Sequence, residues 1–344
     1  MGFFDSLFGK YGTHRHSDRL IWKFETIGKV GARPRIDGST TYVACRGGRF
    51  ATGKRGALYA LDLGSGKERW NFRPERGGIS SRPLVREDKV FFGTQSGAFY
   101  AVRADTGQEV WSLTGSQQID SSPAAFENLI VFGSNDGSLY AVESKTGNKK
   151  WSFETNDKVH SSPFILGESI LCGSDNGNLY SLDVYSGNLN WVFGAGDAVA
   201  SSPISDGNFV YVGSQDGNLY ALNFDSGSEK WRYRTQKAFY SSPCLNDELV
   251  FCGNVDGSMY AIDRDTGSEV WKFTTGGQIL SSPLFLSGAL YFGSWDKKLY
   301  ALDALSGTKK WNFKTGGPIM SSPSVAGKSV LFGSHDENIY CIKK

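Results

Sequence analysis

The chain has 344 residues, and its 37 Lys and Arg nearly balance its 35 Asp and Glu, so the net charge of +2 indicates no particular class of partner. Its 43 Gly, 23 Phe, 15 Tyr and 9 Trp are typical of a turn-rich all-β fold and argue against a helical one. No run approaches about 18 apolar residues, which excludes a membrane-spanning helix.

The first nineteen residues lie outside the repeat that fills the remainder of the chain. Within residues 1–10, apolar side chains stand at positions 3, 4, 7 and 8, which is the spacing of one helical face. Such a segment could contact a membrane surface peripherally, bind a partner protein or remain a frayed tail. We predict an amphipathic or flexible tail over residues 1–19 and one folded domain over residues 20–344.

Three residue types then recur in phase, each of them eight times. The tryptophan series is spaced by 40 residues from its third member onward, and series of tyrosines and prolines keep the same period. The tryptophans are Trp22, Trp70, Trp111, Trp151, Trp191, Trp231, Trp271 and Trp311. A period of about 40 residues is typical of a β-propeller blade.

Each repeat carries the signals of four short strands. In one repeat, strands are predicted to begin at Ser121 and to cover residues 129–133, 139–142 and 150–153. Asp136 and Gly137 stand between the second and third of these strands, where Asp-Gly favours a tight hairpin turn. The pattern predicts a four-stranded antiparallel blade.

The two ends of the chain complement each other. Trp22 precedes every other strand of the repeat, whereas the last repeat stops after its third strand, over residues 338–343. Residues 20–25 are therefore predicted to supply the fourth strand of the last blade, which removes the open edges of an unclosed array. The predicted fold is an all-β, eight-bladed β-propeller of four-stranded antiparallel blades, closed by the N-terminal strand.

The repeated residues are assigned to the fold. A buried tryptophan removes about 150–250 Å² from water, and every blade needs such a contact with its neighbour, so the eight tryptophans are interpreted as packing between blades. Cys172, Cys252 and Cys341 occupy apolar positions of the repeat and are interpreted as small core residues, whereas the repeat does not indicate a role for Cys45 and Cys244. No ligand spacing indicates a metal site.

The repeat has a known relative. The pattern Gly-Ser-x-Asp-Gly-x-Leu-Tyr-Ala-Leu-Asp-x-x-Ser/Thr-Gly-x-x-x-Trp-x-Phe stands at Gly213 to Tyr233, with Asn223 at the second Asp position. It resembles the PQQ-type repeat of quinoprotein alcohol dehydrogenases and of the BamB lipoproteins of outer-membrane β-barrel assembly. The resemblance covers residues 20–344 and implies the propeller fold.

The resemblance does not extend to the functional sites of those families. It implies, for the dehydrogenases, a quinone stacked on a vicinal disulfide and a Ca²⁺ ion, but no two cysteines here are adjacent, and no Asp/Glu cluster offers the oxygens that Ca²⁺ needs. We therefore expect no enzymatic activity, cofactor or metal. A signal peptide with a lipobox cysteine, implied by the lipoproteins, is missing near the start, so a cytoplasmic location is expected, with membrane association through residues 1–10 as an addition.

Positions that differ between blades are the candidates for function. The residue before the Ser-Ser-Pro motif is Asp120, His160 or Tyr240 in three blades, and the hairpin between second and third strands carries Trp295 and His335 in two others. Exposed aromatic residues at hairpin tips are typical of interfaces, whereas drift of loop residues, or packing of Trp295 on neighbouring lysine stems, is the alternative. His160 and Asp120 come from adjacent blades and could pair, but no nucleophile accompanies them.

The first blade has an insertion rich in positive charge. Its proline and tyrosine, Pro34 and Tyr59, stand 25 residues apart, against 17 in the other blades. The inserted loop carries Arg46, Arg49, Lys54 and Arg55. We interpret it as a binding patch for an acidic partner, with a solvated loop as the alternative; nucleic acid is disfavoured because the rest of the ring is acidic.

These observations favour a non-enzymatic, monomeric scaffold. It would bind a protein partner through the face that holds the loops between blades and the hairpins between second and third strands. Two alternatives remain open: a small-molecule sensor or PQQ-dependent oxidoreductase that holds a quinone-like ligand in the central channel, and a BamB-like outer-membrane protein assembly factor.

Overall fold

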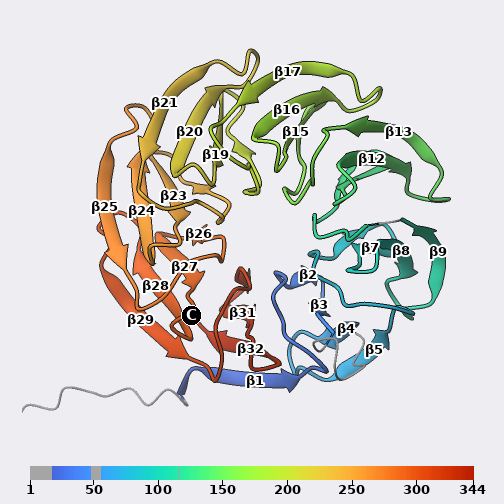
Figure 1. The fold of residues 1–344 in the computed structure, drawn as a ribbon. Coiled ribbons are helices and arrows are strands. Elements are labelled where there is room, and N and C mark those ends of the chain that lie inside the picture. The colour runs from blue at the N-terminus through green and yellow to red at the C-terminus, as the bar shows by residue number, and fades with distance from the viewer. Residues whose placement is uncertain (1–17, 48–55, 116) are drawn as a thin grey trace, which may run out of the picture.

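The computed structural model describes residues 18–47, 56–115 and 117–344. These residues form 32 strands in eight four-stranded antiparallel sheets, which stand as blades around a central channel (Figure 1). The eight-bladed propeller predicted from the repeat is confirmed. No helix in this part of the chain is long and apolar enough to cross a membrane.

The first four blades follow one another along the chain. Blade 1 holds β2 (Arg35–Asp37), β3 (Thr40–Cys45), β4 (Ala57–Asp62) and β5 (Glu68–Phe72). Blade 2 holds β6 (Leu84–Arg86), β7 (Lys89–Gly93), β8 (Ala98–Arg103) and β9 (Glu109–Thr114). Blade 3 holds β10 (Ala124–Phe126), β11 (Leu129–Gly133), β12 (Ser138–Glu143) and β13 (Lys149–Glu154). Blade 4 holds β14 (Phe164–Leu166), β15 (Ser169–Gly173), β16 (Asn178–Asp183) and β17 (Leu189–Gly194).

The last four blades complete the ring. Blade 5 holds β18 (Ile204–Ser205), β19 (Phe209–Gly213), β20 (Asn218–Asn223) and β21 (Glu229–Arg234). Blade 6 holds β22 (Cys244–Leu245), β23 (Leu249–Gly253), β24 (Ser258–Asp263) and β25 (Glu269–Thr274). Blade 7 holds β26 (Leu284–Leu286), β27 (Ala289–Gly293), β28 (Lys298–Asp303) and β29 (Lys309–Lys314). Blade 8 holds β30 (Ser324–Ala326), β31 (Ser329–Gly333), β32 (Asn338–Lys343) and β1 (Leu20–Glu25).

Blade 8 joins the two ends of the chain. β1 pairs antiparallel with β32, with Trp22 opposite Cys341 and Phe24 opposite Ile339 (Figure 1). Thr26 continues this contact beyond the strand, since both its N–H and its hydroxyl donate to the carbonyl of Glu337. The predicted closure by residues 20–25 is therefore present in the structure.

The burial of each strand depends on its position within the blade. The two middle strands of a blade are buried on both faces, as in β11, because the neighbouring blades cover them. The outermost strand alternates, so that β13 buries Trp151 and exposes the residues on either side of it. In β13 both Trp151 and Phe153 face the next blade, where Phe153 packs edge-on against Tyr180 with 5.2 Å between the ring centroids.

The tryptophans join neighbouring blades in the same way around most of the ring. The indole N–H of Trp231 in β21 donates to the carbonyl of Arg264 in blade 6, at 2.9 Å. Its ring lies against Gly267, where an added Cβ would come within 2.8 Å of the indole. Trp22 makes the same two contacts with Leu63 and Gly66 of blade 1, across the junction of the chain ends.

The first strand of each blade begins later than the sequence indicates. Residues 121–123 lie in the loop, and β10 starts only at Ala124. The two serines make other bonds, because Ser121 Oγ accepts from the N–H of Gly133 and the N–H of Ser122 donates to Ser162 of blade 4. Pro123 has no N–H for a strand ladder. The Ser-Ser-Pro motif is therefore a link between blades rather than a strand.

We call the face that carries the loops between blades and the hairpins between second and third strands the mouth face. Glycine fills the left-handed position of these hairpins in blades 2 to 6, as at Gly137 with φ +92°. Lys297 and Glu337 take the same position in blades 7 and 8, with φ of 71° and 67°. A left-handed conformation is unfavourable for residues with a Cβ, so these two hairpins keep strained residues on the mouth face.

Candidate functional site

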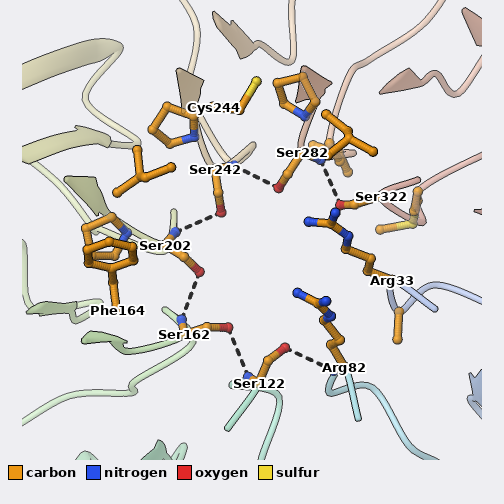
Figure 2. A pocket seen from close by; sticks show the side chains of 18 of the residues that line it. Arg33, Arg82, Ser122, Ser162, Phe164, Ser202, Ser242, Cys244, Ser282 and Ser322 are labelled. Carbon is orange, nitrogen blue, oxygen red and sulfur yellow. Dashed lines mark hydrogen bonds between the residues drawn. The ribbon is translucent and has the colours of Figure 1, made fainter. Parts of the chain in front are cut away.

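A ring of serines surrounds the channel below the mouth face. In each of six successive pairs of blades, a backbone N–H donates to a serine Oγ forty residues further along, at 2.9 to 3.1 Å (Figure 2). We call the accepting residues the serine belt: Ser122, Ser162, Ser202, Ser242, Ser282 and Ser322. The second serine of the Ser-Ser-Pro motif therefore lines the channel in blades 3 to 8.

Two arginines take the corresponding positions in blades 1 and 2. Arg33 and Arg82 interrupt the serine belt, and both guanidinium groups point into the channel (Figure 2). The Nε of Arg33 donates to Ser324 Oγ at 3.2 Å, and the Nε of Arg82 has no partner in the described residues. Burial, followed by the positive charges of Arg33 and Arg35, lowers the pKa of Arg82 to about 9.

Further unpartnered polar groups gather in the same sector of the ring. Buried side-chain nitrogens without a hydrogen-bond partner in the described residues include Nε of Arg35, Nε of Arg46 and Nε2 of His335. Arg46 and His335 flank Gly31, where an added Cβ would lie 3.9 Å from each of these two nitrogens. None of the arginines of this sector forms an ion pair with a described residue, whereas some cations elsewhere do, as Arg69 does with Asp62 at 2.7 Å. The sector over blades 8, 1 and 2 is thus positive and uncompensated.

The mouth face has a different character over blades 3 and 4. His160 lies between two carboxylates: its Nδ1 is 2.9 Å from Asp175 and its Nε2 is 3.8 Å from Asp120. The hairpin N–H of Asp175 donates to the carbonyl of Lys158, which holds the hairpin against the loop that carries His160. The sequence suggested that His160 pairs with Asp120. In the structure His160 contacts both carboxylates, and its contact with Asp175 is the shorter one.

We expect His160 to titrate above the ordinary value of 6.5, because its hydrogen bond to Asp175 stabilises the protonated imidazole and raises the pKa. A pKa that is higher in the folded than in the unfolded state stabilises the protein below about pH 6.5, and this contribution is lost as the pH rises through the raised pKa. Asp175→Asn should return the pKa of His160 toward its ordinary value, which an NMR titration of the ring protons would measure.

His335 provides the internal comparison for this titration. Burial, followed by the positive charges of Lys29 and Arg46, lowers the pKa of His335 to about 4. We expect that value to stay unchanged in the Asp175→Asn variant, since His335 belongs to the basic sector in blade 8. A pKa of His160 that does not respond to the substitution would contradict the assigned pairing.

Apolar side chains occupy the mouth face over blades 6 to 8. The loops between blades and the hairpins alternate there, since the hairpin N–H of Trp295 donates to Gln278 of the adjoining loop, and that of Val255 donates to Ala238. This order places apolar residues in a row that extends from the mouth face into the channel, where Leu280 and Met320 line the cavity. The residues of the row are Tyr240, Val255, Leu280, Trp295 and Met320. We call this row the apolar arc. Its two aromatic side chains are 43% and 41% exposed, at Tyr240 and Trp295 respectively.

The structure brings together some of the residues singled out from the sequence and leaves others outside. Asp120 and His160 meet on blades 3 and 4, Tyr240 and Trp295 lie in the apolar arc, and His335 lies beside Arg46. Arg49, Lys54 and Arg55, like residues 1–17, lie outside the described residues. Cys45 is buried, and Cys244 lines the channel.

The sequence did not lead us to single out Arg33 and Arg82 as residues of the channel. The signal that places them in the channel is their alignment with the second serine of the Ser-Ser-Pro motif, which reads Ala32-Arg33-Pro34 in blade 1 and Ser81-Arg82-Pro83 in blade 2. No group of three His, Cys, Asp or Glu residues in the described parts of the chain could hold a metal ion.

Closed four-stranded blades around a channel define the chain as an eight-bladed propeller. A family model described as outer membrane protein assembly factor BamB matches residues 11–119 and 243–344, and one described as the β-propeller of a β-alanine-activating enzyme matches residues 79–289. The chain belongs to the family of PQQ-repeat β-propellers.

Among curated proteins, the chain is similar to 1-butanol dehydrogenase (cytochrome c) of Thauera butanivorans. The two are 28% identical over 102 residues, which is 27% of this chain and 14% of the dehydrogenase. The match thus spans a small part of that relative.

Solved structures share the fold at low sequence identity. The computationally designed Ika8 protein has a TM-score of 0.83 at 16% identity, covering 95% of this chain and all of that one. BamB from Moraxella catarrhalis has a TM-score of 0.80 at 16% identity, with 94% and 97% covered. The quinohemoprotein alcohol dehydrogenase of Comamonas testosteroni has a TM-score of 0.79 at 14% identity, with 94% and 76% covered. Likeness at this level shows the fold alone.

Proposed function

We propose that this propeller is a non-enzymatic scaffold that binds a protein partner on its mouth face. The observation that carries the proposal is the apolar arc, which holds two half-exposed aromatic side chains on the same face as an uncompensated basic sector. Tryptophan, tyrosine and arginine are the residues that most often dominate the binding energy of protein interfaces.

The chemistry of the face indicates the chemistry of the partner. An apolar segment of the partner would cover Tyr240 and Trp295, and acidic side chains beside it would face Arg46 and the basic sector. The partner is therefore expected to carry apolar and acidic side chains next to each other, in agreement with the acidic partner expected from the sequence.

Two groups of similar proteins favour two different, more specific functions. BamB is described as an outer membrane protein assembly factor, and its likeness to this chain supports a role in holding other proteins. The quinoprotein dehydrogenases share the same propeller and favour a ligand in the channel. We propose the scaffold, because the features that set one blade apart from another gather on the mouth face, and the described residues there include no catalytic nucleophile.

The scaffold proposal predicts that Tyr240→Ser with Trp295→Ser lowers capture of partner proteins from cell extract by about tenfold or more, since aromatic anchors carry most of the binding energy. Quantitative mass spectrometry of proteins retained by the immobilised full chain measures the effect. The matched control is Tyr185→Ser with Leu305→Ser, which removes 49% and 65% exposed apolar side chains from turns on the opposite face.

Equal retention by the mouth-face variant and the control would contradict the proposal. So would stoichiometric binding of PQQ in the presence of Ca²⁺, seen as quinone absorbance that remains with the protein after gel filtration, because it would assign the channel to redox chemistry.

A further inference from the structure

The central channel contains a cavity of about 660 Å³, whose lining includes Arg46, Leu280 and Met320 together with residues that the scaffold proposal does not use. Arg33 and Arg82 lie on one side of it, the serine belt surrounds it, and apolar side chains such as Phe164 and Leu245 form part of the wall (Figure 2). Sites for small molecules have volumes of about 300–1,000 Å³ and combine an apolar wall with a few convergent polar groups. The cavity has both properties.

The serine belt directs hydrogen-bond donors at this space. Each belt hydroxyl oxygen accepts a backbone N–H from the preceding blade, which leaves its own proton free to donate. Among the described residues, no belt hydroxyl donates a hydrogen bond to a protein acceptor, so the lining offers donors on several sides of the channel.

The two arginines add positive charge that no carboxylate balances. Asp and Glu are absent from the described lining of the cavity, and neither Arg33 nor Arg82 forms an ion pair with a described residue. An uncompensated charge on a side chain that is largely removed from water is costly, and an anion would remove that cost. Six other blades carry serine at the same position, so the fold itself does not require arginine there.

We propose that the central cavity is a binding site for a small phosphate-bearing molecule, with the phosphate held by Arg33 and Arg82 and by the free hydroxyl protons of the serine belt. A phosphate group presents oxygens in several directions, which suits donors placed around a ring, whereas the two oxygens of a carboxylate lie in one plane. Guanidinium groups bind phosphate with two parallel hydrogen bonds each. The remainder of the ligand would lie against the apolar wall.

Isothermal titration calorimetry of the full chain with inorganic phosphate and pyrophosphate, at an ionic strength fixed with potassium chloride, tests the site. We expect saturable binding of one anion per chain. Arg33→Ser with Arg82→Ser gives these two blades the serine found in the other six, and should weaken binding by about tenfold or more because the charge-assisted hydrogen bonds are lost.

The control is Arg73→Ser with Arg76→Ser, which removes the same net charge from exposed positions and should bind as the unmodified chain does. Absence of saturable binding to the unmodified chain, an equal loss in both double variants, or binding of citrate without binding of either phosphate would overturn the proposal. The Tyr240→Ser and Trp295→Ser double variant should bind phosphate as the unmodified chain does. The phosphate site and the scaffold proposal can therefore fail separately.

Discussion

Deletion of residues 1–26 should abolish the cooperative unfolding transition of the propeller. The deletion removes β1, leaves the edge of β32 unpaired, and takes Trp22 away from Leu63 and Gly66. Burial of one tryptophan contributes up to about 4–6 kcal/mol at about 25 cal/mol per Å². That amount is comparable with the whole free energy of unfolding of many proteins, about 5–15 kcal/mol. Thermal unfolding followed by circular dichroism would show the loss.

Deletion of residues 1–17 is the matched control. It leaves β1 in place, together with Arg19, whose guanidinium lies over the ring of Trp311 at 4.5 Å and donates to the carbonyl of Lys344 at 2.7 Å. This shorter deletion should melt at the temperature of the full chain. A protein that lacks residues 1–26 and still melts like the full chain would refute the role of β1 in closing the ring.

The second large effect is expected at the contacts between blades. Trp231→Ala should lower the free energy of unfolding by about 3–5 kcal/mol, because the side chain is only 8% exposed and its removal leaves a cavity over Gly267. The carbonyl of Arg264 would lose its indole donor as well. Urea denaturation followed by circular dichroism measures the change.

Trp295→Ala is the comparison within the same residue type. Trp295 lies at a hairpin of the mouth face and is 41% exposed, so its removal should change the free energy of unfolding by about 0.5 kcal/mol or less. Equal destabilisation by the two substitutions would mean that Trp295 packs as tightly as the tryptophans between blades, and that it is not available to a partner.

Most of the fold could be predicted because each blade repeats the evidence of the others. The period of the tryptophans located the outermost strands, and the absence of a fourth strand after residues 338–343 indicated that residues 20–25 close the ring. The start of the innermost strand could not be predicted in this way. A sequence motif does not reveal that the N–H of Ser122 is bonded to a serine of the next blade, in place of a strand neighbour.

The candidate site was less predictable, because it depends on which loops lie beside each other. His160 was paired from sequence with Asp120, but a hairpin from the same blade brings Asp175 closer. The apolar arc likewise arises only when loops and hairpins alternate around the rim. The sequence indicated that Trp295 is exposed. It did not reveal that the loop carrying Leu280 and the hairpin carrying Val255 lie in the same row as Trp295.

The pairing of β1 with β32 also sets the order in which the molecule can be completed. During synthesis β1 leaves the ribosome before the strands of blades 1 to 7, and its partner strand β32 leaves after them, so Ile21 and Trp22 have no partner strand while seven blades are made. A strand held back in this way is an exposed edge that can pair with another chain. The finished ring therefore depends on translation reaching residues 338–343, and a chain that stops earlier keeps β1 as an unpaired strand.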